Sequence, residues 1–254
     1  MDVISEIKKK ISELGGGKII FLTISGSHLY GFESGDSDID YRGTFITSTN
    51  NLLGLKSASD VIEMERDGND IVLFEVKKEI VLALSGNCNV LEHINSKPIV
   101  NTAEFIKLRQ LVNNAFGKNG LYNSYKGMAA SNYKKFVLQG RNTIKKYLYV
   151  FRGLMAGIHV LQTGEIEPNI EELNKYFKFP EVKQLIGMKK EGKENDTPPK
   201  ELDTGRLEER INYLFGKIDE AYLKSKIPDQ PDEKDVKALN EFLKKIRKGM
   251  LRQN

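Results

Sequence analysis

Two aspartates, Asp38 and Asp40, stand at the start of a run of strand-forming residues, directly after a loop rich in Gly and Ser. Aspartate is a poor strand former, so this placement needs a compensating reason. Residues two apart in a strand point to the same side, so both carboxylates project together. Two carboxylates this close repel each other unless a cation lies between them. A divalent metal such as Mg²⁺, which prefers oxygen ligands and keeps room for phosphates, meets this need.

A Gly-Ser pair, Gly26 and Ser27, follows the apolar run over residues 18–25. A glycine there lets the backbone approach a phosphate closely, and the serine hydroxyl and nearby N–H groups can donate hydrogen bonds to its oxygens. Asp36 comes too early to join the pair of aspartates, and its position favours turn or cap chemistry over metal binding. Arg42 shares the face of Asp40, where it could either hold the carboxylates in place or contact a phosphate.

A calcium loop is the other class of site that a cluster of aspartates suggests. The EF-hand pattern requires Gly at its sixth position and Glu at its twelfth. Counted from Asp36, these positions hold Tyr41 and Thr47. The sequence therefore excludes an EF-hand here.

The predicted secondary structure that positions these residues changes near residue 100, from mixed strands and helices to helices alone. The first part shows a helical pattern over 3–14, strand-like runs with a hairpin signal at 67–69, and helical patterns over 76–86 and 89–96. Strands are predicted over 18–25, 38–47, 61–66 and 70–76. The second part shows helical periodicity over 103–116, 124–138, 143–164, 169–177, 204–226 and 232–250, with a polar loop over 188–204.

These patterns predict an α+β fold in two domains. Residues 1–100 would form a short mixed sheet with helices on one face, and residues 101–254 an all-helical domain that closes over it. The candidate site would then lie in the cleft between the two domains.

Composition excludes several classes of protein. The 254-residue chain is 39% hydrophobic and 29% charged, which is typical of a globular protein, and no apolar run is as long as a membrane span. A single cysteine cannot form an internal disulfide, and with three histidines it argues against a structural zinc site. We therefore expect a cytoplasmic protein without a membrane partner.

The basic residues are unevenly distributed. Between Lys126 and Arg152 the chain has seven Lys or Arg residues and no Asp or Glu, within a net charge of +4. This segment is either a solvated helix face or a surface for the phosphates of a nucleotide or an RNA. Lys145 and Arg152 are seven residues apart, so they share a helix face with Tyr149 between them.

Together, Gly26-Ser27, Gly31 and the segment Ser37-Asp38-Ile39-Asp40 resemble the DNA polymerase β-like nucleotidyltransferase superfamily. The likeness extends in order through 70–78, 85–96, 124–135 and 145–166 to one branch of predicted nucleotidyltransferases, some of which are associated with RNA ligases. It covers roughly residues 18–166. It implies a polymerase β-like nucleotidyltransferase domain followed by a helical domain.

The resemblance implies transfer of a nucleoside monophosphate from a nucleoside triphosphate to an acceptor hydroxyl, with release of pyrophosphate. Two Mg²⁺ or Mn²⁺ ions would be held by Asp38, Asp40 and a third carboxylate on a neighbouring strand. We expect Asp70 as this third ligand, by its register in related sequences, and Glu75 as the alternative. The two are five residues apart on one strand, so they face opposite sides. The expected nucleotide is ATP, with the choice of base left open.

A metal-bound triphosphate keeps surplus negative charge, so cations from the helical part are expected beside it. Lys134 and Lys145 are the first candidates and Arg152 the next. Ser131 and Tyr133 could donate hydrogen bonds to the nucleotide.

The acceptor stays open between an RNA end, a protein hydroxyl and a small molecule. The basic helical part favours RNA, whereas the lack of a recognisable RRM or KH signature weakens that reading. The alternative function is a catalytically inactive nucleotide sensor or partner-binding subunit with the same fold. The presence of both Asp38 and Asp40 favours the enzyme.

Overall fold

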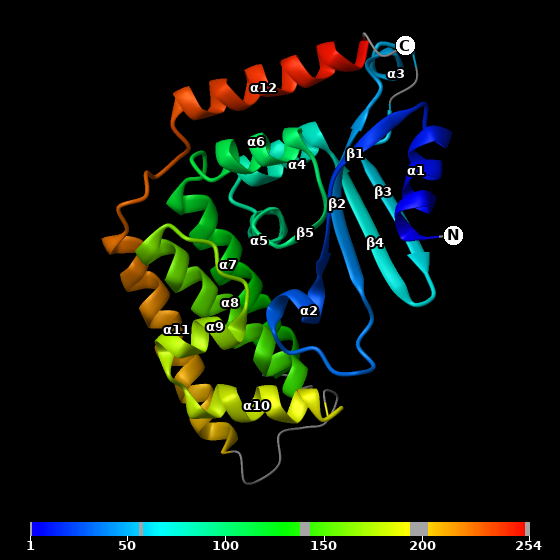
Figure 1. Ribbon diagram of the computed structural model, residues 1–254. Coiled ribbons are helices and arrows are strands. Elements are labelled where there is room, and N and C mark those ends of the chain that lie inside the picture. The colour runs from blue at the N-terminus through cyan, green and yellow to red at the C-terminus, as the bar shows by residue number, and fades with distance from the viewer. Residues whose placement is uncertain (1, 56–57, 138–142, 194–202, 252–254) are drawn as a thin grey trace.

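A five-stranded mixed sheet forms the first half of the protein (Figure 1). The computed structural model describes residues 2–55, 58–137, 143–193 and 203–251. The strand order is β3-β4-β2-β1-β5. The β2 and β4 strands run parallel, and the other neighbouring pairs run antiparallel. The strands are β1 (Gly17–Ser25), β2 (Asp40–Thr47), β3 (Val61–Arg66), β4 (Asn69–Glu75) and β5 (Pro98–Asn101). The expected mixed sheet is thereby confirmed, with β5 as a strand that the sequence analysis did not predict.

Both faces of the sheet are covered, whereas helices were expected on one face. On one side, α1 (Val3–Glu13) buries Ile7 and Ile11 against Leu22, Phe45 and other strand residues. On the other side lie α4 (Val76–Leu84), α5 (Cys88–Ile94) and α6 (Ala103–Val112). The apolar spacing predicted the helix over 3–14 but not the side of the sheet on which it packs.

Short turns and helices connect the strands. The hairpin between β3 and β4 turns at Asp67 and Gly68, which both have positive φ angles (50° and 80°), as the predicted turn requires. A single-turn helix, α2 (Gly26–Tyr30), follows β1, and α3 (Thr49–Leu52) follows β2. The loop from Gly31 to Ile39 then joins α2 to β2.

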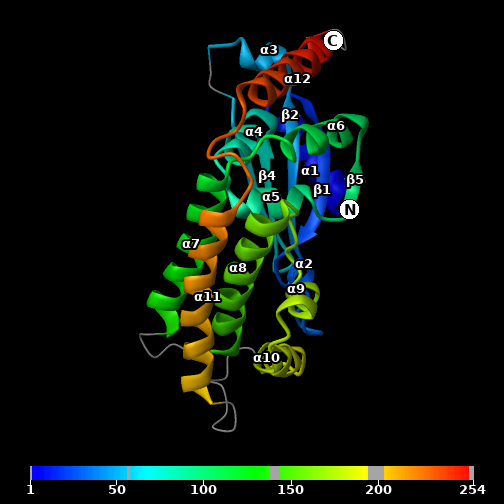
Figure 2. The same cartoon turned by 90° about the vertical axis from the view of Figure 1, so that its left-hand side faces the viewer.

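The second half of the chain is helical and is built around α8 (Ile144–Thr163), whose side chains are buried along most of its length. Figure 2 shows α7 and α11 beside it, and both pack against it. The other helices are α7 (Lys118–Asn132) with a turn of π-helix over Tyr133–Val137, α9 (Ile170–Phe177), α10 (Pro180–Lys190), α11 (Thr204–Lys224) and α12 (Glu233–Leu251). None of the helices that the structure describes is long and apolar enough to cross a membrane.

The helices α6, α10 and α12 differ from what the sequence predicted. The helix α10 was not predicted, and it includes residues 188–190 of the expected polar loop, while residues 194–202 lie outside the described part of the chain. The helices α6 and α12 pack on the sheet-bearing half rather than with the helical bundle. The division at residue 100 is therefore not the line along which the helices separate in space.

Candidate active site

The three aspartates come together at one end of the sheet. Asp40 is the first residue of β2 and lies opposite Ser25, the last residue of β1. The parallel register of β2 and β4 places Asp70 on the strand next to Asp40. The guanidinium of Arg42 links the two, with its Nη2 2.7 Å from Asp70 Oδ2 and 3.6 Å from Asp40 Oδ1. Asp38 lies in the loop just before β2.

The surroundings of Asp40 disfavour its ionised form. Burial is the main reason why the pKa of Asp40 is raised, and the charges of Asp70 and Asp38 raise it further. Arg42 and Lys145 lower it in part. A carboxylate whose ionised form is disfavoured in this way is a site where a further cation is stabilising.

The donor set fits a hard divalent cation, because it consists of carboxylate oxygens. However, among the described residues no three acidic, histidine or cysteine side chains are gathered in a ligand arrangement. The guanidinium of Arg42 contacts both Asp40 and Asp70 and supplies positive charge to these two carboxylates. Asp38, Asp40 and Asp70 are the residues that would hold a metal here.

Gly26 is required where β1 ends. Its φ angle is +63°, and a Cβ atom there would lie 1.9 Å from Asp40 Oδ2. Only glycine lets the backbone pass so close to this carboxylate. Ser27 follows it in α2, where its carbonyl oxygen accepts a hydrogen bond from the N–H of Phe32. The Gly-Ser pair thus lies directly beside the aspartates, as its spacing in the sequence suggested.

A pocket of about 320 Å³ opens beside Asp40 and Gly26. The sheet side supplies these residues and Arg42, and the helical side closes it with Tyr149 of α8. The segment around α5 contributes Asn87, Asn89, Val90 and His93. This pocket therefore lies where the sheet-bearing half and the helical bundle meet.

Two lysines from the helical half approach the loop that carries Asp38. The pKa of Asp36 is lowered mainly by a hydrogen bond with Ser34 and further by the charges of Lys189 and of Lys145 at the start of α8, and the charge of Lys145 also lowers the pKa of Asp40 in part. Lys189 of α10 is fully buried, and its Nζ donates to Ser34 Oγ at 2.7 Å and lies 3.3 Å from Ser37 Oγ. Lys145 was a sequence candidate, whereas Lys189 was missed.

A signal for Lys189 was present in the sequence. It falls at the fourth place of the stripe Val182, Leu185, Ile186, Lys189, whose other members are buried apolar residues. A lysine at a core position of an amphipathic helix needs a polar partner across the interface. The stripe could have indicated a buried lysine, but not that its partners are Ser34 and Ser37.

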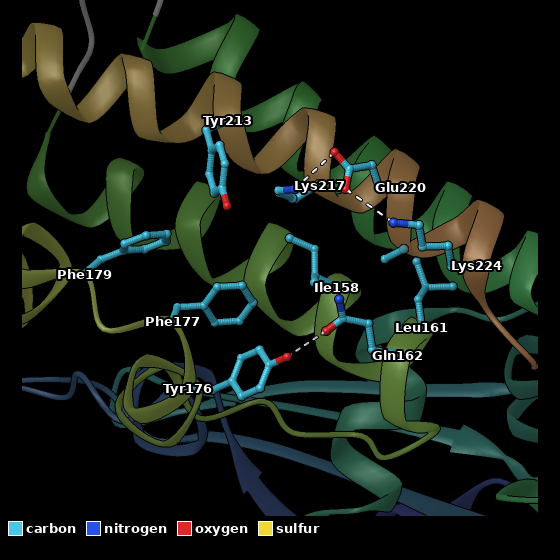
Figure 3. A pocket seen from close by; sticks show the side chains of 11 residues that line it. Ile158, Leu161, Gln162, Tyr176, Phe177, Phe179, Tyr213, Lys217, Glu220 and Lys224 are labelled. Atoms are coloured by element: carbon cyan, nitrogen blue, oxygen red, sulfur yellow. Dashed lines mark hydrogen bonds and ion pairs between the residues drawn. The ribbon is translucent and has the colours of Figure 1, made fainter.

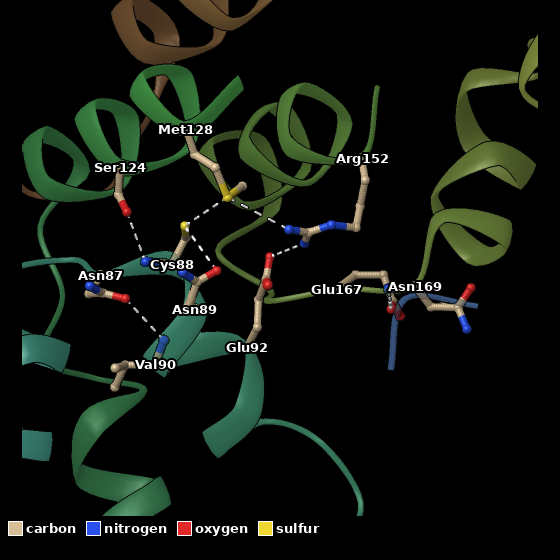
Figure 4. A network of polar contacts seen from close by, with 10 residues as sticks. All are labelled: Asn87, Cys88, Asn89, Val90, Glu92, Ser124, Met128, Arg152, Glu167 and Asn169. Carbon is tan, nitrogen blue, oxygen red and sulfur yellow. Dashed lines mark hydrogen bonds and ion pairs between the residues drawn. The ribbon is translucent and has the colours of Figure 1, made fainter. Parts of the chain in front are cut away.

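The position of Arg152 does not agree with a role on the triphosphate. Its side chain is 1% exposed, and its Nη1 donates to Glu92 Oε1 at 2.6 Å (Figure 4). The guanidinium also stacks on the ring of Tyr30 at 3.7 Å. The expectation that Arg152 contacts the triphosphate is therefore corrected. Its guanidinium instead pairs with Glu92 of α5 and stacks on Tyr30 of α2. Glu92 therefore has a structural role as the buried partner of this guanidinium.

The residues at the end of α7 do not line the pocket beside Asp40. The ring of Tyr133 packs against Phe215 of α11. Ser131 and Lys134 are exposed. Their expected contacts with the nucleotide stay predictions, to which this arrangement gives no support.

Glu75, the alternative third ligand, lies at the opposite end of β4 from Asp70. Its carboxylate caps α4 by accepting from the N–H of Lys77 at 2.8 Å and forms an ion pair with Arg247 of α12 at 3.1 Å. The structure thus brings Asp70, and not Glu75, beside Asp40. That Asp70 binds a metal stays a prediction.

The fold and the aspartate cluster define a nucleotidyltransferase-like protein of the polymerase β type. A family model, the RNA repair pathway DNA polymerase beta family, matches residues 2–245, and the chain therefore belongs to this family. The suspected superfamily is confirmed by this match.

Two relatives align with most of this chain, as the family model does. The uncharacterized protein YcgL of Bacillus subtilis is 33% identical over 206 residues, which cover 76% of this chain and 78% of the relative. The uncharacterized protein MJ0002 of Methanocaldococcus jannaschii is 28% identical over 233 residues, covering 89% and 94%. A nucleotidyltransferase-like protein of Exiguobacterium sibiricum, known from its crystal structure, is 13% identical with a TM-score of 0.27, over 86% of this chain and 73% of that one. That last likeness is too low to support an argument.

Proposed function

We propose that the chain is a metal-dependent nucleotidyltransferase that moves a nucleoside monophosphate from a triphosphate, with ATP as the expected donor, to an acceptor hydroxyl. The observation that carries the proposal is the pocket lined by Asp40 and Gly26, with Asp70 on the neighbouring strand and the charges of Asp38 and Asp70 both acting on Asp40. Family membership supports the same class of chemistry.

Each residue has a role in this proposal. Asp38, Asp40 and Asp70 would hold two Mg²⁺ or Mn²⁺ ions, which supply charge neutralisation for the attacking and leaving oxygens when bound. Lys145 would contribute positive charge toward the triphosphate from the start of α8, since its charge already acts on Asp40. The acceptor oxygen forms a bond to the α-phosphorus, the bond to the β-phosphate oxygen breaks, and pyrophosphate leaves. The hydroxyl proton passes to a carboxylate of the cluster.

Incubation with each α-phosphate-labelled nucleoside triphosphate and Mg²⁺ or Mn²⁺ tests the proposal, with total RNA and total cell protein as acceptor pools. The matched control is the double variant Asp38→Ala/Asp40→Ala. Label transferred by the wild type alone supports the proposal and gives the acceptor class. Turnover retained in the double variant would refute the mechanism. Metal-dependent nucleotide binding, without transfer to either pool and without pyrophosphate release on addition of small hydroxyl compounds, would favour the sensor.

A further inference from the structure

One face of α11 carries cations and an aromatic ring at helical spacing. Arg206, Arg210, Tyr213, Lys217 and Lys224 follow one another at intervals of four, three, four and seven residues. All five border the buried stripe of the helix, and their side chains reach solvent. At 1.5 Å per residue the set extends over about 27 Å. We name it the α11 stripe.

A pocket of about 580 Å³ lies beside the α11 stripe, between α8, α9 and α11 (Figure 3). Ile158 and Leu161 of α8 contribute apolar side chains to it. Four aromatic side chains also line it, namely Tyr176, Phe177, Phe179 and Tyr213. Tyr176 is 61% exposed and Tyr213 is 50% exposed, so both side chains reach solvent, with the ammonium of Lys217 over the Tyr213 ring at 5.4 Å. Large exposed rings around a cavity mark a binding site rather than a core.

The charges around this pocket are positive on balance. Lys217 lies 2.9 Å from Glu220, and Lys224 lies 4.0 Å from the same carboxylate. Arg206 and Arg210 share the carboxylate of Glu181. The four cations of the α11 stripe contact two carboxylates, and Glu209, three residues after Arg206, adds a third acidic side chain beside them. Arg210 also stacks on Phe179 at 5.2 Å. An anionic ligand would find surplus positive charge directly beside aromatic rings.

We propose that the α11 stripe and its pocket bind a single-stranded nucleic acid, with bases stacked on Tyr176 and Tyr213 and the backbone phosphates along the cations. Aromatic rings beside a basic groove are the features by which proteins hold single strands. A length of about 27 Å matches several phosphates at about 3.4 Å each in a stacked strand, more than one free nucleotide would cover. A protein partner is less favoured, since the centre of a protein interface is depleted of lysine.

The inference extends the proposed function by giving the acceptor a chemical class, and in that respect it rests on the proposed function. Strand binding itself is measured without the reaction. The two can therefore fail separately, because the Asp38→Ala/Asp40→Ala variant should bind the strand as the wild type does.

Fluorescence anisotropy of a labelled, unstructured 12-nucleotide RNA, titrated with the full-length protein over a range of salt concentrations, tests the inference. The double variant Tyr176→Ala/Tyr213→Ala should bind at least about tenfold more weakly, because each change removes a stacking surface. The double variant Lys217→Ala/Lys224→Ala should also bind more weakly. In addition, it should lower the slope of log affinity against log salt by about 0.7 per cation.

Matched controls keep the result specific. Leu223→Ala removes a 78% exposed side chain from the same helix outside the pocket, and Lys234→Ala removes an exposed cation from the region of α12. Both controls should bind as the wild type. Equal affinity of all variants, or no loss of affinity when the single strand is replaced by a duplex, would overturn the inference. Affinity for AMP equal to that for the 12-nucleotide strand, and lost in the tyrosine variant, would make the ligand a free nucleotide and also overturn it.

Discussion

Asp40 is held in a position where its negative charge is disfavoured. Its pKa is raised, first by burial and then by Asp70 and Asp38, against the opposing charges of Arg42 and Lys145. A raised pKa in the folded state means that the contribution of Asp40 to stability is complete below its unfolded value of 3.8 and is lost as the pH rises through the folded value.

The prediction is that Asp40→Asn raises the melting temperature at pH 7.5, without divalent ions, by roughly 1–3 °C. The difference should vanish well below pH 3.8, where the wild-type carboxyl is protonated in both the folded and the unfolded state. Thermal unfolding at the two pH values, with Asp67→Asn as the control on an exposed carboxylate, measures it. Melting temperatures that are equal at pH 7.5 would show that Arg42 fully offsets the burial of Asp40.

Lys189 of α10 contacts the loop before Asp38, although the two are far apart in the sequence. Its ammonium group contacts the Ser34 and Ser37 hydroxyls, so Lys189→Met should loosen this loop and lower nucleotidyl transfer about tenfold. The fold should remain stable, because the Ser34 and Ser37 hydroxyls that the ammonium contacts are uncharged and also hydrogen-bond to each other.

A purely structural role for Lys189 predicts the opposite pattern, a lower melting temperature with transfer unchanged. Lys190→Met, which removes an exposed lysine paired with Glu171 on the same helix, is the control and should leave both quantities unchanged. The metal concentration for half-maximal transfer should rise in Lys189→Met and not in this control.

At the scale of elements, β4 places two acidic residues at its opposite ends. Asp70 lies beside Asp40 at one end, whereas Glu75 caps α4 and holds Arg247 at the other. Asp70→Asn should therefore lower transfer by more than about 100-fold with little effect on stability. Glu75→Gln should lower stability and leave transfer within a fewfold. Rate and unfolding measurements on both variants decide it, and the reverse ranking would assign the third ligand to Glu75.

The contact between α5 and α8 depends on one buried ion pair. Glu92 and Arg152 are both 1% exposed, and burial raises the pKa of Glu92 despite the nearby guanidinium. Arg152→Met leaves the carboxylate buried without its partner and should cost about 3–5 kcal/mol of unfolding free energy. Arg152→Met/Glu92→Leu should recover most of this loss. Denaturant titration measures both, and a double variant no more stable than the single one would mean that the guanidinium acts mainly by stacking on Tyr30.

The sequence predicted most elements because their signals are local. Short runs of apolar and strand-forming residues define β1 to β4, and helical spacing defines α1, α8 and α11. The proximity of Gly26 to the aspartates also follows from local order. Arg152 and Lys189 could not be placed, because their partners lie 60 and 155 residues away. The short strand β5 carries too few residues for a periodic pattern.

At the scale of the whole molecule, α12 packs residues 233–251 against the sheet-bearing half. It crosses from the helical bundle to the sheet-bearing half, where the backbone carbonyl of Arg247 accepts a hydrogen bond from Thr49 Oγ1 at 2.7 Å (Figure 1). It buries Leu239, Phe242 and Met250 against that half. The residue pattern of a single helix does not show against which part of the protein it packs. For this reason α12 was expected within the helical domain of residues 101–254.

Deletion of residues 231–254 should therefore destabilise the sheet-bearing half rather than the bundle that precedes the cut. Burial of the three large apolar side chains of α12 contributes about 1.5–3 kcal/mol each, so the loss is comparable with the 5–15 kcal/mol that stabilises a typical domain. Hydrogen exchange should show lost protection in β2, α4 and α6, where α12 and its Arg247–Glu75 pair are missing. The triple variant Leu239→Ala/Phe242→Ala/Met250→Ala, in the full chain, should reproduce the loss without shortening the protein. Protection lost first in α8 and α11 instead would show that α12 stabilises the bundle.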